Sequence, residues 1–156
     1  MRWLWLVSVL ALLGACSTDG PTRPNTTASG LSFRDLRRGR GTPAGTGDYV
    51  TIHYTIWLEN GTKIDSSRDR QEPFEFTLGR GIVIAGFDEG ITGMRVTGIR
   101  KLWIPSDLAY GSHGAGGVIP PNAALIAEIE LLAIRSTSAV REPAPGSLLA
   151  APRATE

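Results

Sequence analysis

The sequence predicts an α+β domain in which several antiparallel strands curl over one short helix. Several segments alternate apolar and polar residues with the period of a β-strand, whereas one short segment has helical spacing. The chain also carries 19 glycines and 10 prolines among its 156 residues, which favours a turn-rich β protein over a helical bundle. At this length it holds one domain of ordinary size, with residues left over for tails.

The first strands are expected around a hairpin. Residues Leu31–Arg38 predict one strand, and Tyr49–Leu58 predict the clearest one, because apolar residues recur there at every second position. Asn60 and Gly61 follow, and both residue types tolerate the positive φ of a tight hairpin turn. We therefore expect Thr62–Asp65 to return antiparallel. The residues expected on one face of the long strand are Val50, Ile52, Tyr54, Ile56 and Leu58.

Three further segments are expected to form strands. Phe74–Leu78 alternates, and Val96–Ile104 and Ala123–Ile134 predict two longer strands. A glycine-rich loop, residues 110–117, lies between the last two and is closed by Val118–Pro121. One face of the final strand should carry Leu125, Ala127, Ile129, Leu131 and Ala133.

The single helix is expected over Gly86–Thr92. Phe87, Gly90 and Ile91 have helical spacing. Asp88 and the acidic residue after it fall in the first turn, where a negative charge complements the helix dipole. Gly93 is a natural residue to end the helix.

The N-terminus resembles an export signal. Arg2 precedes an apolar run from Trp3 to Leu13, and two small residues, Gly14 and Ala15, come before Cys16. A positive start, a short apolar core and small residues before a cleavage site are the parts of a secretory signal peptide. The run is shorter than the roughly 20 residues that span a bilayer as a helix.

Leu13-Gly14-Ala15-Cys16 resembles the bacterial lipobox, a motif whose cysteine receives a diacylglycerol group. The one cysteine of the chain stands where the motif requires it, and a polar stretch follows. The alternative is an ordinary signal peptide that happens to contain a cysteine. We expect residues 1–15 to be a lipoprotein signal peptide, 16–30 the lipidated Cys16 with a flexible tether, and 31–135 the domain. Residues 136–156 have no apolar period and predict a disordered tail.

Several chemistries are excluded by composition. The formal net charge is +1 and no basic stripe is present, so nucleic-acid binding is not expected. The run from Arg37 to Arg40 is interpreted as a solvated strand end rather than as a phosphate-binding patch. A single cysteine forms no disulfide within the chain, and His53 and His113 are too far apart to suggest a metal site. No cofactor is expected, and His53 is assigned a structural role.

Six short fragments follow one another through the middle of the chain. They are His53-Tyr54-Thr55, Asp65-Ser66-Ser67-Arg68-Asp69-Arg70, Pro73-Phe74-Glu75-Phe76, Gly86-Phe87-Asp88-Glu89-Gly90, Ala109-Tyr110-Gly111 and Ile119-Pro120-Pro121-Asn122-Ala123. In this order and spacing they resemble the FKBP family of peptidyl-prolyl cis/trans isomerases, over about residues 31–134. The resemblance implies an antiparallel sheet of five to six strands wrapped on one short helix, with substrate proline bound between them.

The resemblance also implies the residues of the site. The groups expected to act on the amide are Tyr54, Asp65 and Tyr110. The residues expected to bind substrate are Arg70, Phe74, Phe76, Val83, Ile84, Phe87 and Ile119. Each has a plainer interpretation taken alone: the phenylalanines could be core, and Asp65 with Arg70 a surface ion pair.

Two positions depart from the family pattern. Ile64 stands where many members carry Phe, and Ala127 replaces another aromatic residue. Ala115 in place of a loop aromatic residue or histidine is a smaller change. These residues predict a wider, less aromatic hollow and a reduced affinity for macrolide inhibitors.

The expected function is peptidyl-prolyl isomerisation during the folding of exported proteins at the bacterial cell envelope. The expected partners are proline-containing unfolded or exported polypeptides, and the membrane through a lipid on Cys16. Ser17 after that cysteine favours the periplasmic face of the outer membrane over the inner membrane. We expect a monomer. The alternative is a weakly catalytic or non-catalytic module that binds unfolded chains, a hypothesis that Ile64 and Ala127 leave open.

Overall fold

The structure is a computed structural model that describes residues 23–136. The expected signal peptide, Cys16 and the tail from residue 137 onward lie outside the described residues. No helix among residues 23–136 is long and apolar enough to cross a bilayer.

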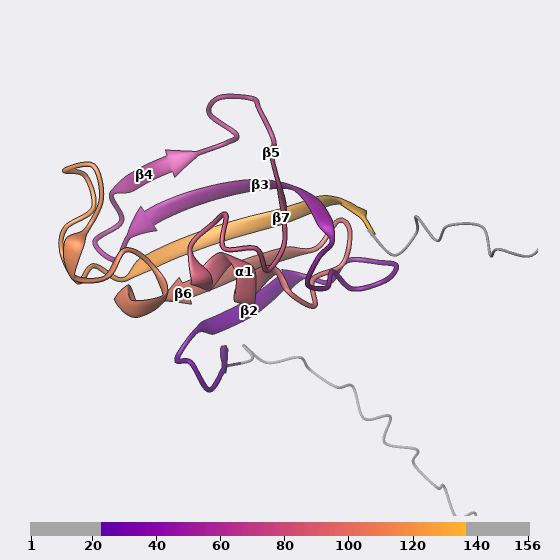
Figure 1. The fold of residues 1–156 in the computed structure, drawn as a ribbon, viewed down its shortest axis with the longest axis horizontal. Helices are drawn as coiled ribbons and strands as arrows, with labels where there is room; N and C mark the ends of the chain where they lie inside the picture. Colours follow the sequence, from indigo (N-terminus) through magenta and orange to yellow (C-terminus); the bar gives the residue numbers. More distant parts are fainter. Residues whose placement is uncertain (1–22, 137–156) are drawn as a thin grey trace, which may run out of the picture.

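Seven strands form one antiparallel sheet in the order β1-β2-β6-β7-β3-β4, and β5 also pairs with β3 (Figure 1). Strands β4 and β5 therefore both lie along the edge of β3 that faces away from β7. The strands are β1 (Asn25–Thr26), β2 (Ser32–Arg37), β3 (Tyr49–Leu58), β4 (Lys63–Ser66), β5 (Phe74–Thr77), β6 (Ile99–Ile104) and β7 (Leu125–Arg135).

The α+β architecture with a curled antiparallel sheet and one short helix is confirmed. The sheet has one strand more than expected, because Asn25 and Thr26 pair with Phe33 and Ser32. These two residues fall inside the segment expected to be a flexible tether. Ser29 also donates a 2.8 Å hydrogen bond to the Glu89 carboxylate, so the end of that segment is attached to the domain.

The alternation expected for β7 changes phase near its end. The register with β3 shifts between Thr51 and Ile52, so that Val50 lies opposite Ile134. Ile134 consequently packs against the core in place of Ala133, which was expected there. A bulge inserts one residue into a ladder, and that turns the following side chains to the other face.

The hairpin between β3 and β4 is formed differently from the expected turn. Gly61 has φ +86°, but Asn60 is not among the described residues with positive φ. The Asn60 side-chain oxygen instead accepts a 2.9 Å hydrogen bond from the Thr62 N–H. Asparagine therefore stabilises this turn through its side chain and not through its backbone conformation.

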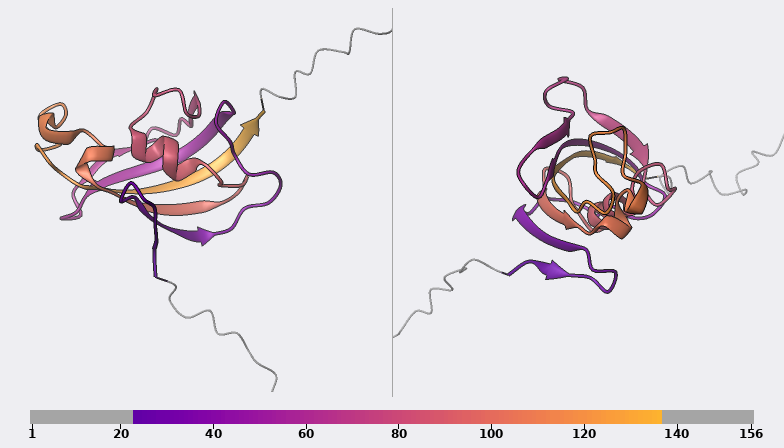
Figure 2. Two further views of the ribbon diagram at one scale, coloured as in Figure 1. Left: turned by 60° about the horizontal axis from the view of Figure 1, so that its bottom comes forward. Right: turned by 90° about the vertical axis from the view of Figure 1, so that its left-hand side faces the viewer.

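Helix α1 (Ala85–Ile91) lies across the concave face of the sheet (Figure 2). Its close approach depends on two glycines. A Cβ added to Gly86 would lie 2.4 Å from Cγ2 of Ile104, and one added to Gly90 would lie 2.5 Å from Cδ1 of Leu102. Because both partners are on β6, the helix rests directly on this strand. Gly93 follows with φ +82°, in agreement with the expected end of the helix.

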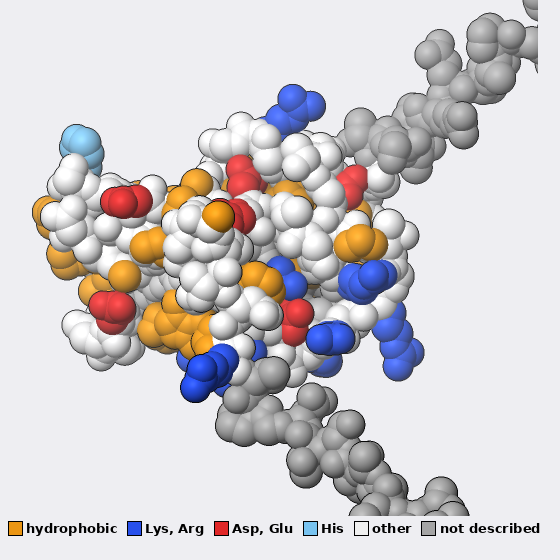
Figure 3. Space-filling model, turned by 90° about the horizontal axis from the view of Figure 1, so that it is seen from below, with side chains coloured by type: hydrophobic (Ala, Val, Ile, Leu, Met, Phe, Trp, Pro, Cys, Tyr) orange, Lys and Arg blue, Asp and Glu red, His pale blue; other side chains and the backbone are white. Residues whose placement is uncertain are grey.

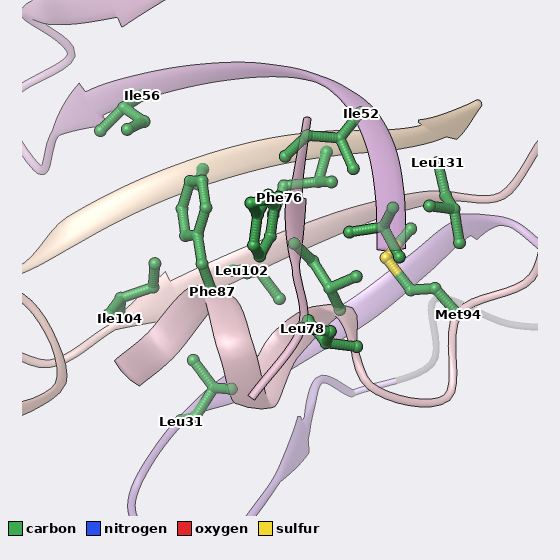
Figure 4. Close-up of a cluster of buried hydrophobic side chains, with 14 of the residues drawn as sticks. Leu31, Ile52, Ile56, Phe76, Leu78, Phe87, Met94, Leu102, Ile104 and Leu131 are labelled. Atoms are coloured by element: carbon green, nitrogen blue, oxygen red, sulfur yellow. The ribbon is translucent and has the colours of Figure 1, made fainter. Parts of the chain in front are cut away.

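One continuous core fills the space between α1 and the sheet (Figure 4). Phe87 and Ile91 of the helix point into it, and Leu102 and Ile129 of the central strands are fully buried. The face predicted for β3 is confirmed at Val50, Ile52 and Ile56, which are all buried. Two 3₁₀ turns, Ser106–Leu108 and Gly111–His113, lie in the connection from β6 to β7.

The core position of Leu102 gives a stability prediction. Leu102→Ala should lower the free energy of unfolding by about 2–5 kcal/mol, because it leaves a cavity between β6 and α1. Leu36→Ala is the matched control, since that leucine is 46% exposed and its loss should cost under about 1 kcal/mol. Urea unfolding followed by circular dichroism measures both variants. Equal losses would contradict this description of the core.

Candidate active site

A hollow of about 420 Å³ opens between the sheet and α1 on the β3–β4 side of the molecule. Side chains of the neighbouring strands β3, β4 and β5 and of α1 line it, together with the loop before α1 and the loop after β6. The lining residues are Tyr54, Ile56, Asp65, Phe74, Gly81, Ile82, Val83, Ile84, Phe87 and Tyr110.

Three aromatic rings pack edge to face around this hollow. The Tyr54 ring lies 6.0 Å from the Phe74 ring at an interplanar angle of 83°, and 5.9 Å from the Phe87 ring at 74°. Such contacts add about 0.5–1.5 kcal/mol each to the burial of the rings. Phe87 is 4% exposed. The hollow therefore has rigid apolar walls.

A polar cluster of three side chains lies at the edge of the hollow. The Tyr54 hydroxyl donates a 2.6 Å hydrogen bond to Oδ2 of Asp65. Arg70 donates to Oδ1 of Asp65 and also, over 3.0 Å, to the Tyr54 hydroxyl. The Ser66 N–H adds a 2.7 Å bond to Oδ1 of Asp65. Both carboxylate oxygens are thus held by donors.

The cluster keeps Asp65 ionised. Burial on its own raises the pKa of Asp65, but the hydrogen bonds from Tyr54, Arg70 and the Ser66 N–H together hold this pKa below its ordinary value. Burial also raises the pKa of the Tyr54 phenol, and so does its bond to the Asp65 carboxylate, against the opposing effect of Arg70. The pair is therefore a neutral phenol that donates to a carboxylate.

A buried serine fixes the segment that carries Asp65 and Arg70. Ser67 is fully buried, and its Oγ accepts a 2.9 Å hydrogen bond from the Tyr54 N–H. Its own N–H donates to the Tyr54 carbonyl over 3.0 Å, and Nδ1 of His53 lies 3.0 Å from Oγ. These contacts attach the segment to β3 beside Tyr54, and they agree with the structural role predicted for His53.

Asp88 of α1 fixes the loop that leads into the helix. Its carboxylate accepts hydrogen bonds from the N–H groups of Gly79 and Gly81, at 2.8 and 3.2 Å. The loop then presents Val83 and Ile84 to the hollow. The Ile84 N–H and the Tyr110 hydroxyl make no hydrogen bond to any described residue. Two donors are therefore free at the rim.

Most of the site residues expected from the sequence come together. Tyr54, Asp65, Phe74, Val83, Ile84, Phe87 and Tyr110 line the hollow. Arg70 lies at its edge, bonded to Asp65. Phe76 and Ile119 are 2% and 6% exposed and do not line it; Phe76 stacks on Phe74 at 5.4 Å, behind the wall.

Three lining residues were missed. Ile56 lies two positions after Tyr54 on the face of β3 that the alternation had already identified, so the period could have indicated it. Gly81 and Ile82 belong to the loop before α1, where no period operates. Ile64 and Ala127, expected to widen the hollow, do not line it; Ala127 is fully buried in the sheet.

The polar groups of the site do not suggest a metal centre. Among residues 23–136, no three or more His, Cys, Asp or Glu side chains lie close enough together to hold a metal ion. The arrangement offers an apolar hollow, a fixed carboxylate and free donors at the rim. It suits the binding of a peptide segment with an apolar ring.

The family model of FKBP-type peptidyl-prolyl cis-trans isomerases matches residues 41–132. The chain belongs to this family. It is similar to an FK506-binding protein of Neisseria meningitidis serogroup B, with 59% identity over 105 residues that cover 67% of this chain and 96% of the relative. It is also 53% identical over 88 residues to the peptidyl-prolyl cis-trans isomerase Fkbp12 of Drosophila melanogaster, covering 56% of this chain and 82% of that one. The chain is thus a peptidyl-prolyl cis-trans isomerase.

Solved structures support the same fold. FkpA from Escherichia coli superposes with a TM-score of 0.68 at 35% identity, covering 72% of this chain and 52% of that one. AtFKBP13 superposes with a TM-score of 0.69 at 38% identity, covering 73% of this chain and all of that one. Since the Neisseria relative is matched over 96% of its length, a domain similar to this one makes up nearly the whole of that protein.

The cluster around Asp65 gives a prediction about pH. Because its pKa is depressed in the folded protein, the stabilisation that it contributes is complete above its ordinary value of 3.8 and is lost as the pH falls through the lower, folded pKa. Arg70→Ala should raise the pKa of Asp65, because burial then opposes ionisation with one partner fewer. Carboxyl-detected NMR titration measures the change. Arg80→Ala, which removes an arginine outside the cluster, should leave the value unaltered; a wild-type pKa above 3.8 would refute the assignment.

Proposed function

We propose that this isomerase acts on exported polypeptides at the bacterial cell envelope, to which a lipid on Cys16 attaches it. The observation that carries the catalytic part is the rigid aromatic hollow with two free donors at its rim. The envelope location rests on the N-terminal sequence.

The reaction breaks no covalent bond. Rotation about an X–Pro bond has a barrier of roughly 18–20 kcal/mol because the planar amide is stabilised by resonance. The twisted transition state loses this resonance, and its carbonyl is less polar than that of the planar amide. A hollow that excludes water therefore disfavours the planar form more than the twisted one.

The walls are suited to a proline ring. Phe74, Phe87 and Tyr54 surround the hollow, and Val83 and Ile84 close it from the loop before α1. The Ile84 N–H can hold a peptide carbonyl next to the proline, and the Tyr110 hydroxyl can donate to a second one. Both groups position the substrate chain across the hollow, so the rotating bond stays over the aromatic rings.

The Asp65 carboxylate supplies negative charge at the edge of the hollow. Tyr54 and Arg70 hold it in one orientation. A fixed charge of this kind acts on the dipole of the rotating carbonyl without transferring a proton, because electrostatic stabilisation needs only a preorganised group. Arg70 is accordingly a positioning residue.

A binding module without useful turnover is the second candidate. Ile82 and Val118 are both 59% exposed, the first on the hollow and the second in the loop that follows Tyr110. Exposed apolar side chains around a peptide site favour the holding of unfolded chains. The two candidates differ in whether the domain accelerates the slow, proline-limited phase of refolding.

The lipid anchor is supported by three features of the sequence. Cys16 is the single cysteine, it follows Leu13-Gly14-Ala15, and a short polar stretch separates it from the first described residue, Arg23. Two or more acyl chains give stable membrane attachment, whereas one chain gives marginal binding. Because Ser17 follows the cysteine, we propose that the protein is attached to the periplasmic face of the outer membrane. We also propose that it is a monomer. A reduced affinity for macrolide inhibitors also stays a prediction.

Catalysis by residues 17–156 can be tested directly. This fragment should accelerate the slow phase of a refolding protein limited by prolyl isomerisation. Phe74→Ala should reduce kcat/KM at least about tenfold, because it opens the hollow to water. Phe33→Ala is the matched control, since that half-buried phenylalanine on β2 is not part of the hollow. Binding of unfolded protein without acceleration would support the second candidate.

A milder variant tests the donor at the rim. Tyr110→Phe removes one hydroxyl and retains the ring, so kcat/KM should fall by only about two- to tenfold, the range of one neutral hydrogen bond. The same refolding assay measures it. An unchanged rate would exclude the hydroxyl from the reaction.

A separate experiment tests the anchor. In a bacterial host that expresses the full chain, Cys16→Ser should abolish incorporation of radiolabelled palmitate and release the protein from the membrane fraction. Ser17→Ala keeps the cysteine and should still be labelled. Membrane retention of Cys16→Ser equal to that of the wild type would contradict the anchor.

A further inference from the structure

A second hollow, of about 240 Å³, lies beside β2 and β6, toward one edge of the sheet. The hollow described above lies toward the other edge, beside β3 and β4, and is called the prolyl site below. It is formed where β2 ends and the chain enters β6. Four arginines and a single acidic residue surround it. The lining residues are Asp35, Arg37, Arg38, Gly39, Gly93, Met94, Arg95, Gly98 and Arg100.

Two glycines bring the distant arginines together. A Cβ added to Gly39 would lie 2.2 Å from the Arg95 carbonyl oxygen, and one added to Gly98 would lie 2.8 Å from the same atom. The Arg40 N–H donates to the Val96 carbonyl over 2.9 Å, which joins the two segments. The segment after β2 and the turn before β6 therefore touch backbone to backbone.

The acidic residue is already neutralised. Arg100 is 7% exposed, and its Nε donates a 2.6 Å hydrogen bond to Oδ1 of Asp35. Its Nη1 donates to the Gly90 carbonyl over 2.8 Å, and its guanidinium carbon lies 4.3 Å from the centre of the Phe33 ring. Asp35 and Arg100 thus form a fixed, charge-balanced wall.

The other arginines leave the hollow positive. Arg37 is shared between the Thr97 carbonyl and the Glu130 carboxylate. Among the described residues, the Arg95 side chain donates only to the neutral Gly41 carbonyl, and the Arg38 side chain makes no hydrogen bond or ion pair. Two exposed guanidinium groups therefore lack a carboxylate partner. Figure 3 shows Lys and Arg side chains gathered on the right-hand part of the face seen from below.

We propose that this hollow binds a phosphate group through Arg38 and Arg95. Guanidinium groups present paired N–H donors that match the oxygens of a phosphate, and the charge assists each bond. The space exceeds that of several water molecules at about 30 Å³ each, so a phosphate fits within it. From the run that the sequence analysis interprets as a solvated strand end, Arg37, Arg38 and Gly39 line this hollow. Arg95, Gly98 and Arg100 line it from the turn before β6 and from β6 itself.

The phosphate site is separate from the prolyl site. Its strands, β2 and β6, stand toward one edge of the sheet, and β3 and β4 with the prolyl hollow stand toward the other. The two hollows share no lining residue. Bound phosphate should therefore leave isomerase activity unchanged, and the proposal does not depend on the lipid at Cys16.

NMR titration of ¹⁵N-labelled residues 17–156 with inorganic phosphate tests the proposal, with NaCl used to hold the ionic strength constant. The amide signals of Gly39, Gly93 and Gly98 should shift and saturate. In the Arg38→Ala/Arg95→Ala variant the apparent affinity should fall at least about tenfold, because both unpaired charges are gone. The isomerase rate of this variant should equal that of the wild type, which shows that it is folded.

A charge-matched control separates a site from general attraction. Arg23→Ala/Arg80→Ala removes the same charge from exposed positions outside the hollow and should keep the wild-type affinity within about twofold. An equal loss in both double variants would overturn the proposal. So would shifts of the wild-type glycine signals that fail to saturate.

Vesicle flotation identifies the source of the phosphate. Residues 17–156 carry no lipid, so flotation with phosphatidylglycerol vesicles and not with phosphatidylcholine vesicles, lost in Arg38→Ala/Arg95→Ala, assigns the phosphate to an anionic lipid headgroup. A saturable phosphate response without flotation assigns it to a soluble phosphate compound. Both results support the site.

Discussion

The contact between α1 and β6 is the constraint on which the prolyl site depends. Gly86 and Gly90 let the helix backbone rest on Ile104 and Leu102, and any larger residue would push it outward. At this distance Phe87 reaches the Tyr54 ring from the opposite side. The hollow is what remains between helix and sheet once they have approached as closely as glycine permits.

The polar cluster of Tyr54, Asp65 and Arg70 is held in place by contacts with the sheet and not with the helix. Ser67, fully buried, attaches the segment after β4 to the backbone of Tyr54. Asp65 and Arg70 flank it and meet the Tyr54 hydroxyl. The carboxylate is thereby held in one orientation in the free protein, which is the preorganisation that the proposed electrostatic role requires.

Both hollows are made where glycine allows two backbones or a helix and a strand to come close. At the prolyl site the result is apolar, because the side chains left around the space are aromatic and aliphatic. Near Gly39 and Gly98 the side chains left around it are arginines. The same close approach of two backbone segments thus leaves an apolar hollow in one place and a positively charged hollow in the other, according to the side chains beside it.

Local periodicity determined much of this protein by itself. The alternation along β3 predicted both its bounds and its buried face, and the spacing around Phe87 predicted the helix, because these patterns follow from residues near in sequence. The bulge that exchanges Ala133 for Ile134, the pairing of Asn25–Thr26 with β2 and the place of Ile82 on the hollow were decided by the tertiary structure. Each of these three features depends on contact with a strand or loop distant along the chain. The periodicity of neighbouring residues carries no information about such a contact.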